Sequence, residues 1–420
     1  MDVALVSLLT GEGHAAARAS LQAVNGSIGR AITMRGSPKP PANTTSVHKT
    51  HGKGKVDPIA LGFSPKRLEA AFDVVCRAVG DGGGTIPGAV AAIVRRGQII
   101  GPRAYGLAVR SLERVAMRPH TIFDVASLTK VMATLPAVLL LIERGLARLD
   151  DPLALFVPSF GRAGKDKVTL RHLLTHTSRL PAHVDLWHLG LSRLEIIEHI
   201  CNLQLEDQAR LGTDVIYSDL GFIMLGEFVH AVTGQSIADF ARENIFEPLG
   251  MIDTDFLPPD DKRHRIAATE YRGDYGKYMW GEVHDENAYA MGGVAGHAGL
   301  FSTAEDVARY AAMWLNGGTH QGKAVLSRLT VRTATARHTG GAEPRGLGWI
   351  LPSGTHSSGG DLLSPRAFGH TGFTGTSLWC IPESDIGIVL LTNRVHAGRN
   401  GTDIYPLRAR FANAVLAHAE

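Results

Sequence analysis

Strand-like apolar runs lie near both ends of this chain, and helical patterns fill the middle. The first run spans residues 89–94, and two more, 376–381 and 386–392, are joined by a short polar turn. A helical pattern precedes the first run, and another follows the last at about 405–418. The sequence therefore predicts an α+β fold. Both ends of the chain complete one antiparallel sheet flanked by terminal helices, and a helical region is inserted at about 128–320.

The positive charge of the chain is concentrated in its first 60 residues. Of the 43 Lys/Arg and 40 Asp/Glu residues, residues 1–60 hold seven and three, which leaves 36 and 37 for the rest. Residues 36–58 are rich in Gly, Pro, Ser, Thr, His and Lys, a composition typical of disorder. We expect a poorly ordered basic segment at 1–60 and one folded domain at 61–420. Nucleic-acid binders carry their excess charge on a folded face, so no nucleic-acid partner is expected. The segment could instead tether the protein to an anionic surface.

Membrane, disulfide and metal signals are weak. Apolar runs such as 138–142 fall far short of the roughly 18 residues that a membrane span needs, so no integral membrane segment is expected. Asp2 precedes a short apolar stretch, a poor match to a signal peptide, which leaves a periplasmic, secreted or cytoplasmic location open. Cys76, Cys201 and Cys380 show no C-x-x-C spacing. They are expected to be buried small side chains, outside any disulfide framework or zinc ribbon.

Ser127 and Lys130 begin the first of three short polar motifs. They are separated by three positions at the start of a helical pattern, so their side chains share one face. A serine hydroxyl is a weak nucleophile that needs a neighbouring base, and the free N–H groups of a helix start can stabilise negative charge. Alone, this spacing also occurs by chance on amphipathic helices.

The other two motifs are Tyr-Ser-Asp and His-Thr-Gly. Tyr217 and Asp219 precede a helical apolar run, where the serine between them or Asp219 could cap the helix. His370, Thr371 and Gly372 lead into the strand at 376–381, where a glycine allows close approach to a strand edge. Each motif alone is compatible with an ordinary loop tyrosine or turn histidine.

The order and separation of the three motifs resemble those of the serine penicillin-recognising enzymes. The sequence is similar to the β-lactamase-type serine hydrolases, on the branch of class C β-lactamases, D-Ala-D-Ala carboxypeptidases and family VIII-like esterases. The similarity covers about residues 63–420 and includes the stretches 168–178, 292–302 and 346–349. It implies a β-lactamase-like fold and an acyl-enzyme mechanism without a metal or an organic cofactor.

The resemblance also assigns roles to individual residues. Ser127 would be the nucleophile, Lys130 would take its proton, and Tyr217 would act as general base or acid. His370 would stand where relatives carry the lysine of Lys-Thr-Gly. The groups expected to bind the substrate or its oxyanion are Asp219, the Thr371 hydroxyl, Gly372, and the N–H groups of Ser127 and Phe373.

Three residues depart from the pattern of β-lactamases. Asp219 replaces an asparagine, and an ionised carboxylate can only accept hydrogen bonds. His370 replaces a fixed positive charge with one that is present only part of the time near neutral pH. Both changes predict little or no hydrolysis of β-lactams. Arg179 stands where relatives usually have glycine, and only a local loop effect is expected.

Other signals are better explained by structure than by ligand binding. His172 and His176 have metal-like i, i+4 spacing but lack the glutamate of H-E-x-x-H. His284–Asp285 with His297 is a second metal candidate, and neither site is predicted to hold one. The glycine-rich stretch 292–299 lacks the pattern of a phosphate loop and is expected to be a close-packed or mobile loop. Pro136 is expected to kink the helix that begins near Ser127.

The expected substrate is a small molecule or a peptidoglycan fragment that ends in D-Ala, with a small carboxylic ester as the alternative. A catalytically silent binding or sensor protein would usually lack the serine or the lysine, and this chain has both. The sequence leaves the acyl group, the leaving group and the oligomeric state open.

Overall fold

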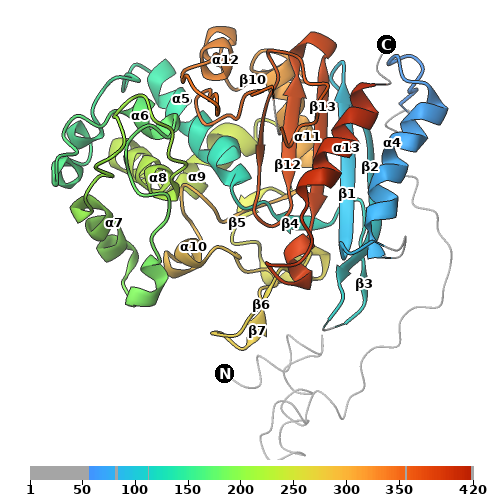
Figure 1. Ribbon diagram of the computed structural model, residues 1–420, viewed down its shortest axis with the longest axis horizontal. Helices are drawn as coiled ribbons and strands as arrows, with labels where there is room; N and C mark the ends of the chain where they lie inside the picture. The colour runs from blue at the N-terminus through green and yellow to red at the C-terminus, as the bar shows by residue number, and fades with distance from the viewer. Residues whose placement is uncertain (1–55, 81–83, 112, 355–356, 418–420) are drawn as a thin grey trace, which may run out of the picture. The chain divides into compact units, whose positions relative to one another are not determined.

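The computed structural model describes residues 56–80, 84–111, 113–354 and 357–417. The disorder predicted for residues 1–60 therefore lies almost entirely outside the described residues. A six-stranded antiparallel sheet dominates the described domain (Figure 1). In sheet order its strands are β11 (Phe368–Thr371), β12 (Ser377–Ile381), β13 (Ile386–Thr392), β1 (Gly88–Arg95), β2 (Gln98–Val109) and β3 (Val115–Ala116).

The centre of this sheet joins the two ends of the domain. β1 pairs antiparallel with β13, with Ile93 opposite Ile388. β1 is buried along its whole length because alternate side chains enter two different cores. Val90 belongs to the core on one face and Ala91 to the core on the other. The α+β fold and the sheet completed from both ends are thus as the apolar runs predicted.

Helices cover both faces of the sheet. The terminal helices α4 (Pro65–Ala78) and α13 (Tyr405–Leu416) lie side by side on one face, as the blue and red helices of Figure 1 show. Phe72 of α4 and Phe411 of α13 contact each other there, with ring centres 6.0 Å apart. On the other face, α11 (Ala304–Leu315) packs against β1, β12 and β13. This helix lies inside the predicted inserted range 128–320, yet it covers the sheet.

The remaining helices gather beside the sheet, mostly in the green part of Figure 1. Their bounds are α5 (Leu135–Glu143), α6 (Leu170–Leu174), α7 (Arg193–Asn202), α8 (Asp219–Thr233), α9 (Ile237–Ala241), α10 (Glu286–Ala290) and α12 (Arg328–Thr335). Four of them, α5, α6, α7 and α9, pack against α8, whose apolar side chains are buried along most of its length.

Short strands connect the helical region to the main sheet. The three-stranded sheet β4–β8–β5 is the most relevant, because β4 ends just before Ser127. The other short strands form two hairpins. Their bounds are β4 (Ile122–Asp124), β5 (Asp255–Phe256), β6 (Tyr271–Arg272), β7 (Lys277–Tyr278), β8 (Leu300–Thr303), β9 (Thr319–His320) and β10 (Lys323–Ala324).

Two local features bear on the sequence expectations. The helix after Ser127 starts with a π-helical turn at Lys130–Thr134 and continues directly into α5, in which Pro136 is the second residue. The Leu135 N–H donates to the Lys130 carbonyl, so the helical hydrogen bonding is irregular just before the proline at which a kink was expected. The expectation that all three cysteines are buried is wrong for Cys76, which is exposed on the outer side of α4, whereas Cys201 and Cys380 are buried.

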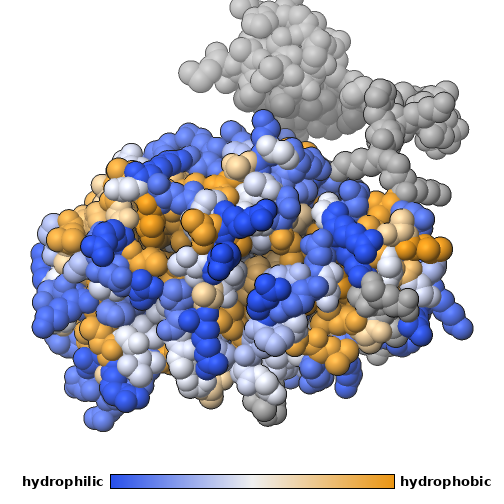
Figure 2. All heavy atoms as spheres, turned by 90° about the horizontal axis from the view of Figure 1, so that it is seen from above, coloured by the Kyte–Doolittle hydropathy of each residue, from blue (hydrophilic) through white to orange (hydrophobic). Residues whose placement is uncertain are grey.

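Hydrophilic and apolar residues are intermixed on the face shown in Figure 2. Among the described residues, no helix is long and apolar enough to cross a bilayer.

Candidate active site

Ser127 lies at a strained turn between β4 and the helix that follows. Ala126, the residue before it, has a φ of 48°, a left-handed conformation that is costly for a residue with a side chain. The buried Asp124 carboxylate accepts the Ala126 N–H at 2.8 Å and holds this turn. Lys130 then follows one helical turn later, and its Nζ donates to Ser127 Oγ at 2.9 Å. The predicted pairing of the two side chains is present in the structure.

Lys130 is fully buried and forms an ion pair with Asp219. Its Nζ lies 2.7 Å from Asp219 Oδ1 and also donates to the His297 carbonyl at 3.1 Å. Burial lowers the pKa of the Lys130 ammonium, but the attraction of Asp219 outweighs it, so the net pKa is raised. Lys130 also holds the pKa of the Asp219 carboxyl well below its usual range, against the opposing effect of burial. The pair is therefore fully charged at neutral pH.

Tyr217 is placed by the start of α8. Ser218 caps this helix by accepting the Gly221 N–H, as one of the two sequence alternatives expected. The Tyr217 ring centre lies 5.0 Å from Lys130 Nζ and 4.5 Å from the His176 ring centre. In the Tyr-Ser-Asp motif, Tyr217 thus contacts Lys130, Ser218 caps the helix, and Asp219 neutralises the charge of the lysine.

His370 lies at the end of β11 on the opposite side of the site. Its side chain is buried, and Nδ1 is bonded to the Thr371 carbonyl at 2.8 Å. A carbonyl only accepts, so Nδ1 carries the proton. Burial, reinforced by the charges of Lys130 and Arg345, lowers the pKa of His370 to about 3. The expectation of partial charge near neutrality is therefore wrong: the ring is neutral, and its Nε2 can only accept.

The turn after β11 packs tightly against the segment before Ser127. A Cβ atom on Gly372 would lie 2.4 Å from the Val125 carbonyl oxygen and 2.1 Å from Thr376 Oγ1. The glycine therefore makes room for the protein's own backbone, where the sequence suggested room for substrate. Phe373 follows with a half-exposed side chain. Among the described residues, no acceptor is bonded to the backbone N–H of Ser127 or of Phe373.

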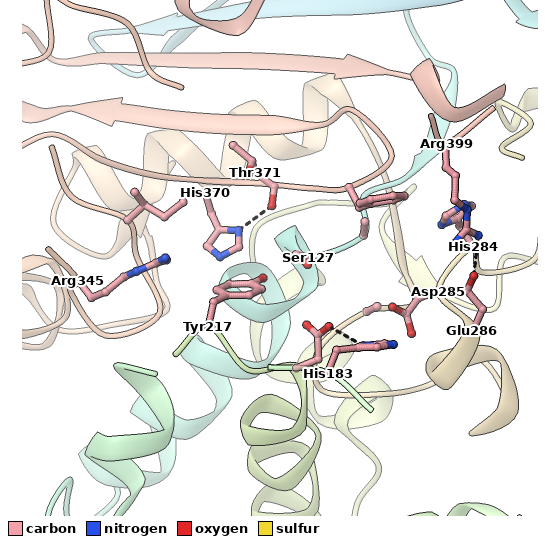
Figure 3. Close-up of a pocket in the computed structure, with 15 residues that line it drawn as sticks. Ser127, His183, Tyr217, His284, Asp285, Glu286, Arg345, His370, Thr371 and Arg399 are labelled. Atoms are coloured by element: carbon pink, nitrogen blue, oxygen red, sulfur yellow. Dashed lines mark hydrogen bonds and ion pairs between the residues drawn. The ribbon is translucent and has the colours of Figure 1, made fainter. Parts of the chain in front are cut away.

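These residues line one cavity of about 500 Å³. Figure 3 shows Ser127 and Tyr217 near its middle, Arg345 and His370 at one end, and Asp285, Glu286 and Arg399 at the other. All the predicted site residues line the cavity except Lys130 and Gly372. Each of these contacts a lining residue: Lys130 Nζ is bonded to Ser127 Oγ, and Gly372 is joined to Phe373 by a peptide bond.

Several lining residues were missed by the sequence reading, and two of them, Arg345 and His183, lie close to the predicted motifs. Arg345 comes from the loop before β11, where no motif marks it. Its guanidinium is buried: Nη2 lies 3.3 Å from Glu343 Oε2, whereas Nε and Nη1 have no hydrogen-bond partner among the described residues. His183 lies between Asp185 and Asp219, with its Nδ1 3.5 Å from Asp219 Oδ2. The contact with Asp219 raises the pKa of His183 to about 9. Only the fold brings either residue to the site.

The histidines considered as metal ligands have hydrogen-bonding partners. His172 caps α6 and His176 Nδ1 accepts the Ser218 N–H. His284 contacts Glu270 and His297 contacts Asp285, at 3.0 and 2.8 Å. In the part of the chain that the structure describes, no cluster of histidine, cysteine and carboxylate side chains could hold a metal ion.

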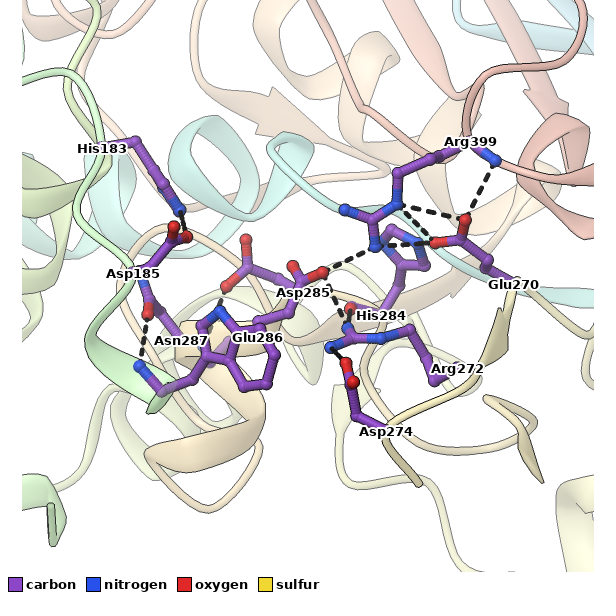
Figure 4. A network of polar contacts seen from close by, with 12 residues as sticks. His183, Asp185, Glu270, Arg272, Asp274, His284, Asp285, Glu286, Asn287 and Arg399 are labelled. Carbon is purple, nitrogen blue, oxygen red and sulfur yellow. Dashed lines mark hydrogen bonds and ion pairs between the residues drawn. The ribbon is translucent and has the colours of Figure 1, made fainter. Parts of the chain in front are cut away.

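The end of the cavity formed by Asp285, Glu286 and Arg399 belongs to a wider network of ion pairs (Figure 4). Arg399 bridges Glu270 and Glu286, at 2.7 and 2.6 Å. Arg272 adds a second contact to Glu286 at 2.8 Å. These charges are mutually neutralised, which holds this wall of the cavity in place.

Comparison with known proteins gives a consistent result. The family model described as Beta-lactamase matches residues 75–413. A protein of Escherichia coli strain K12, provisionally named D-alanyl-D-alanine carboxypeptidase, is 32% identical over 81% of this chain and 85% of its own length. The N-acetylmuramyl-L-alanine amidase of Bacillus subtilis strain 168 is 33% identical over 80% of this chain and 82% of its own.

A solved structure shows the same fold. The penicillin-binding protein homologue of Caulobacter crescentus superimposes with a TM-score of 0.68 at 24% identity, covering 85% of this chain and 99% of that one. The three motifs, the shared cavity and these matches lead to one assignment. The chain belongs to the Beta-lactamase family and is a serine hydrolase of the β-lactamase, DD-peptidase and esterase type.

Proposed function

We propose that Ser127 attacks the carbonyl carbon of a peptide amide in a peptidoglycan-type peptide that ends in a D-Ala carboxylate. The observation that carries this proposal is the 2.9 Å contact between Lys130 Nζ and Ser127 Oγ at the floor of the cavity. The attack forms a C–O bond to Ser127 Oγ and breaks the C–N bond of the amide. Water then hydrolyses the acyl-enzyme ester and regenerates Ser127.

Tyr217 is the better candidate for the proton acceptor. Lys130 is held as an ammonium by Asp219, and a charged amine has no lone pair to take the Ser127 proton. Tyr217, whose ring lies beside this ammonium, would act as the general base that takes the Ser127 proton and as the general acid that passes it to the leaving amine. Lys130 would then stabilise both the Ser127 oxygen and the Tyr217 oxygen by its charge. This assigns Lys130 an electrostatic role instead of the basic role that the resemblance implies.

Arg345 supports a substrate with a terminal carboxylate. Its buried Nε–H and Nη1–H groups have no described partner, and leaving such donors unsatisfied is costly unless a ligand fills them. A neutral His370 with an accepting Nε2 cannot supply this charge. Arg345, assisted by the Thr371 hydroxyl, would bind the carboxylate of the departing D-Ala. The free N–H groups of Ser127 and Phe373 would bind the oxyanion.

The names of the relatives favour an amide of peptidoglycan. One is provisionally named as a carboxypeptidase for D-alanyl-D-alanine and the other as an amidase for an N-acetylmuramyl-L-alanine linkage. Of these two bonds, the D-alanyl one places a free carboxylate beside the scissile amide. The charge of Arg345 therefore supports it over the muramyl one.

Intact-mass spectrometry with three substrate classes tests this function. The wild-type protein is incubated with a D-Ala-D-Ala peptide, a p-nitrophenyl ester and nitrocefin, and Ser127→Ala is the matched variant. We expect turnover of the peptide, a Ser127 adduct that the variant lacks, and little nitrocefin hydrolysis. Turnover confined to the ester would identify a carboxylesterase. Turnover that survives in Ser127→Ala would refute the nucleophile, and no adduct from any class would favour a silent binding protein.

A further inference from the structure

Arg408 is a buried cation with no carboxylate beside it. It lies on the buried face of α13 between apolar neighbours, and its residue exposure is 8%. No described carboxylate lies within ion-pair distance of it. Burial, reinforced by Arg394, lowers the pKa of Arg408 to about 9. Burying an unpaired charge is expensive, so the fold tolerates Arg408 at a cost that calls for a compensating role.

The guanidinium of Arg408 is bonded to two carbonyls of the turn after β11. Its Nη2 donates to the Gly372 oxygen at 2.8 Å and to the Thr376 oxygen at 2.7 Å. The Thr376 oxygen also accepts the Gly372 N–H at 2.8 Å. Arg408 therefore holds the two ends of this turn together, and it does not itself line the cavity.

The Gly372 oxygen belongs to the peptide group whose N–H is that of Phe373. This peptide is trans, since the one cis peptide among the described residues is Gly101–Pro102. In a trans peptide the carbonyl and the N–H point in opposite directions. A cation on the Gly372 oxygen therefore orients the Phe373 N–H away from Arg408. It also strengthens that N–H as a donor, because hydrogen bonds polarise one another along a chain.

The same turn is fixed to the segment that carries Ser127. Thr374 Oγ1 donates to the Asp124 carbonyl at 2.8 Å, and Thr376 Oγ1 donates to the Val125 carbonyl at 2.9 Å. On the outer side, Arg394 Nε donates to the Phe373 carbonyl at 3.0 Å. The position of the Phe373 N–H relative to Ser127 is thus set by side chains on both sides of the turn.

We propose that Arg408 is a positioning residue that orients and polarises the Gly372–Phe373 peptide, so that the Phe373 N–H stabilises the oxyanion formed during attack by Ser127. The inference rests on the proposed function, because it requires that this N–H be one of the two oxyanion donors. It assigns to the C-terminal helix a part in the chemistry that no motif of the sequence indicates.

The test compares Arg408→Met and Arg408→Lys with Arg95→Met. Arg95 is a matched control, since it is also a buried arginine that donates to a backbone carbonyl, that of Gly62, and it does not line the cavity. Steady-state kinetics are measured with whichever substrate the wild-type protein hydrolyses. Inhibition by phenylboronic acid, whose tetrahedral serine adduct places an oxygen at the oxyanion position, is measured in parallel with thermal unfolding.

We expect Arg408→Met to lower kcat by about 10- to 100-fold, with KM nearly unchanged, because the donor is misoriented and weakened, whereas complete removal of an oxyanion donor costs about 100- to 1000-fold. Affinity for phenylboronic acid should fall by a similar factor. Arg408→Lys keeps the charge, and its kcat and boronate affinity should lie between those of the wild type and Arg408→Met. Arg95→Met should lower the unfolding temperature without changing kcat or the boronate affinity.

A lower unfolding temperature with unchanged kcat and boronate affinity would overturn the inference and leave Arg408 a structural residue. If Arg408→Met does not fold, Arg408→Gln decides, because it keeps a donor but carries no charge: wild-type kcat with wild-type boronate affinity overturns the inference. The proposed function fails separately. If Ser127→Ala retains turnover, both proposals fall, whereas loss of turnover in Ser127→Ala with an unaffected Arg408→Met refutes the role of Arg408 alone.

Discussion

The two sides of Ser127 differ in how their charged groups are paired. On one side, Lys130 and Asp219 form a buried pair in which each charge has a partner within 2.7 Å. On the other, Arg345 and His370 are equally buried but keep donor or acceptor atoms that no described residue bonds. A satisfied buried pair holds a fixed electrostatic environment, whereas unsatisfied buried groups mark where a ligand completes the bonding. The comparison assigns chemistry to the first side and substrate recognition to the second.

Replacing Lys130 should have the largest effect on catalysis, because it removes one partner of the buried Lys130–Asp219 pair. Lys130→Met leaves the Asp219 carboxylate buried and removes the charge beside Ser127 and Tyr217. We expect kcat/KM to fall by about a thousandfold or more. Removing one partner of a buried pair should also cost about 3–5 kcal/mol of stability. Steady-state kinetics and urea unfolding measure the two effects.

Lys165→Met is the matched control for this substitution. Lys165 is also fully buried, but its ammonium is bonded to the Leu203 carbonyl and it lies outside the cavity. The Lys165→Met variant should have a lower free energy of unfolding than the wild type but the same kcat/KM. Equal kinetic losses in the two variants would mean that Lys130 acts only through folding.

Replacing Arg345 should have a smaller and more selective effect. Arg345→Met removes the buried donors proposed to bind the substrate carboxylate. Hydrogen bonds to charged groups contribute about 1.5–3 kcal/mol, which corresponds to a rise in KM of about 10- to 100-fold. The rise should be confined to peptides with a free terminal carboxylate. Amidated peptides and p-nitrophenyl esters should be hydrolysed as by the wild type, and an equal loss on both would contradict the assignment of this side to recognition.

The same contrast explains which parts of the fold and of the site could be predicted from the sequence alone. Ser127 and Lys130 could be predicted because they share one helical turn, and the strands at 89–94 and 386–392 because buried strands are continuous apolar runs. Arg345 and Arg408 could not. Each lies far along the chain from the motif it contacts, and an arginine in a loop or a helix usually has a solvated charge. The neutral state of His370 likewise depends on burial and on two cations that only the folded chain brings close.

The smallest expected effect concerns His183, which lines the cavity and contacts Asp219 of the buried pair. Its contact with Asp219 raises its pKa to about 9, above the value near 6.5 expected in the unfolded chain. The folded protein therefore binds a proton more tightly than the unfolded chain. The resulting stabilisation is complete below about pH 6.5 and is lost as the pH rises through about 9.

His183→Asn should remove this pH-dependent contribution. The side chain of His183 is 43% exposed, so solvent screening limits the contribution to less than about 1 kcal/mol. Urea unfolding at several pH values should show a larger free energy of unfolding for the wild type than for the variant at pH 6. This difference should disappear by about pH 9.5. His230→Asn, at an exposed position near the other end of α8, is the control and should give a gap that does not vary in this way. A gap that widens with pH would mean that His183 is neutral in the folded protein, and Asp219 would then be balanced by Lys130 alone.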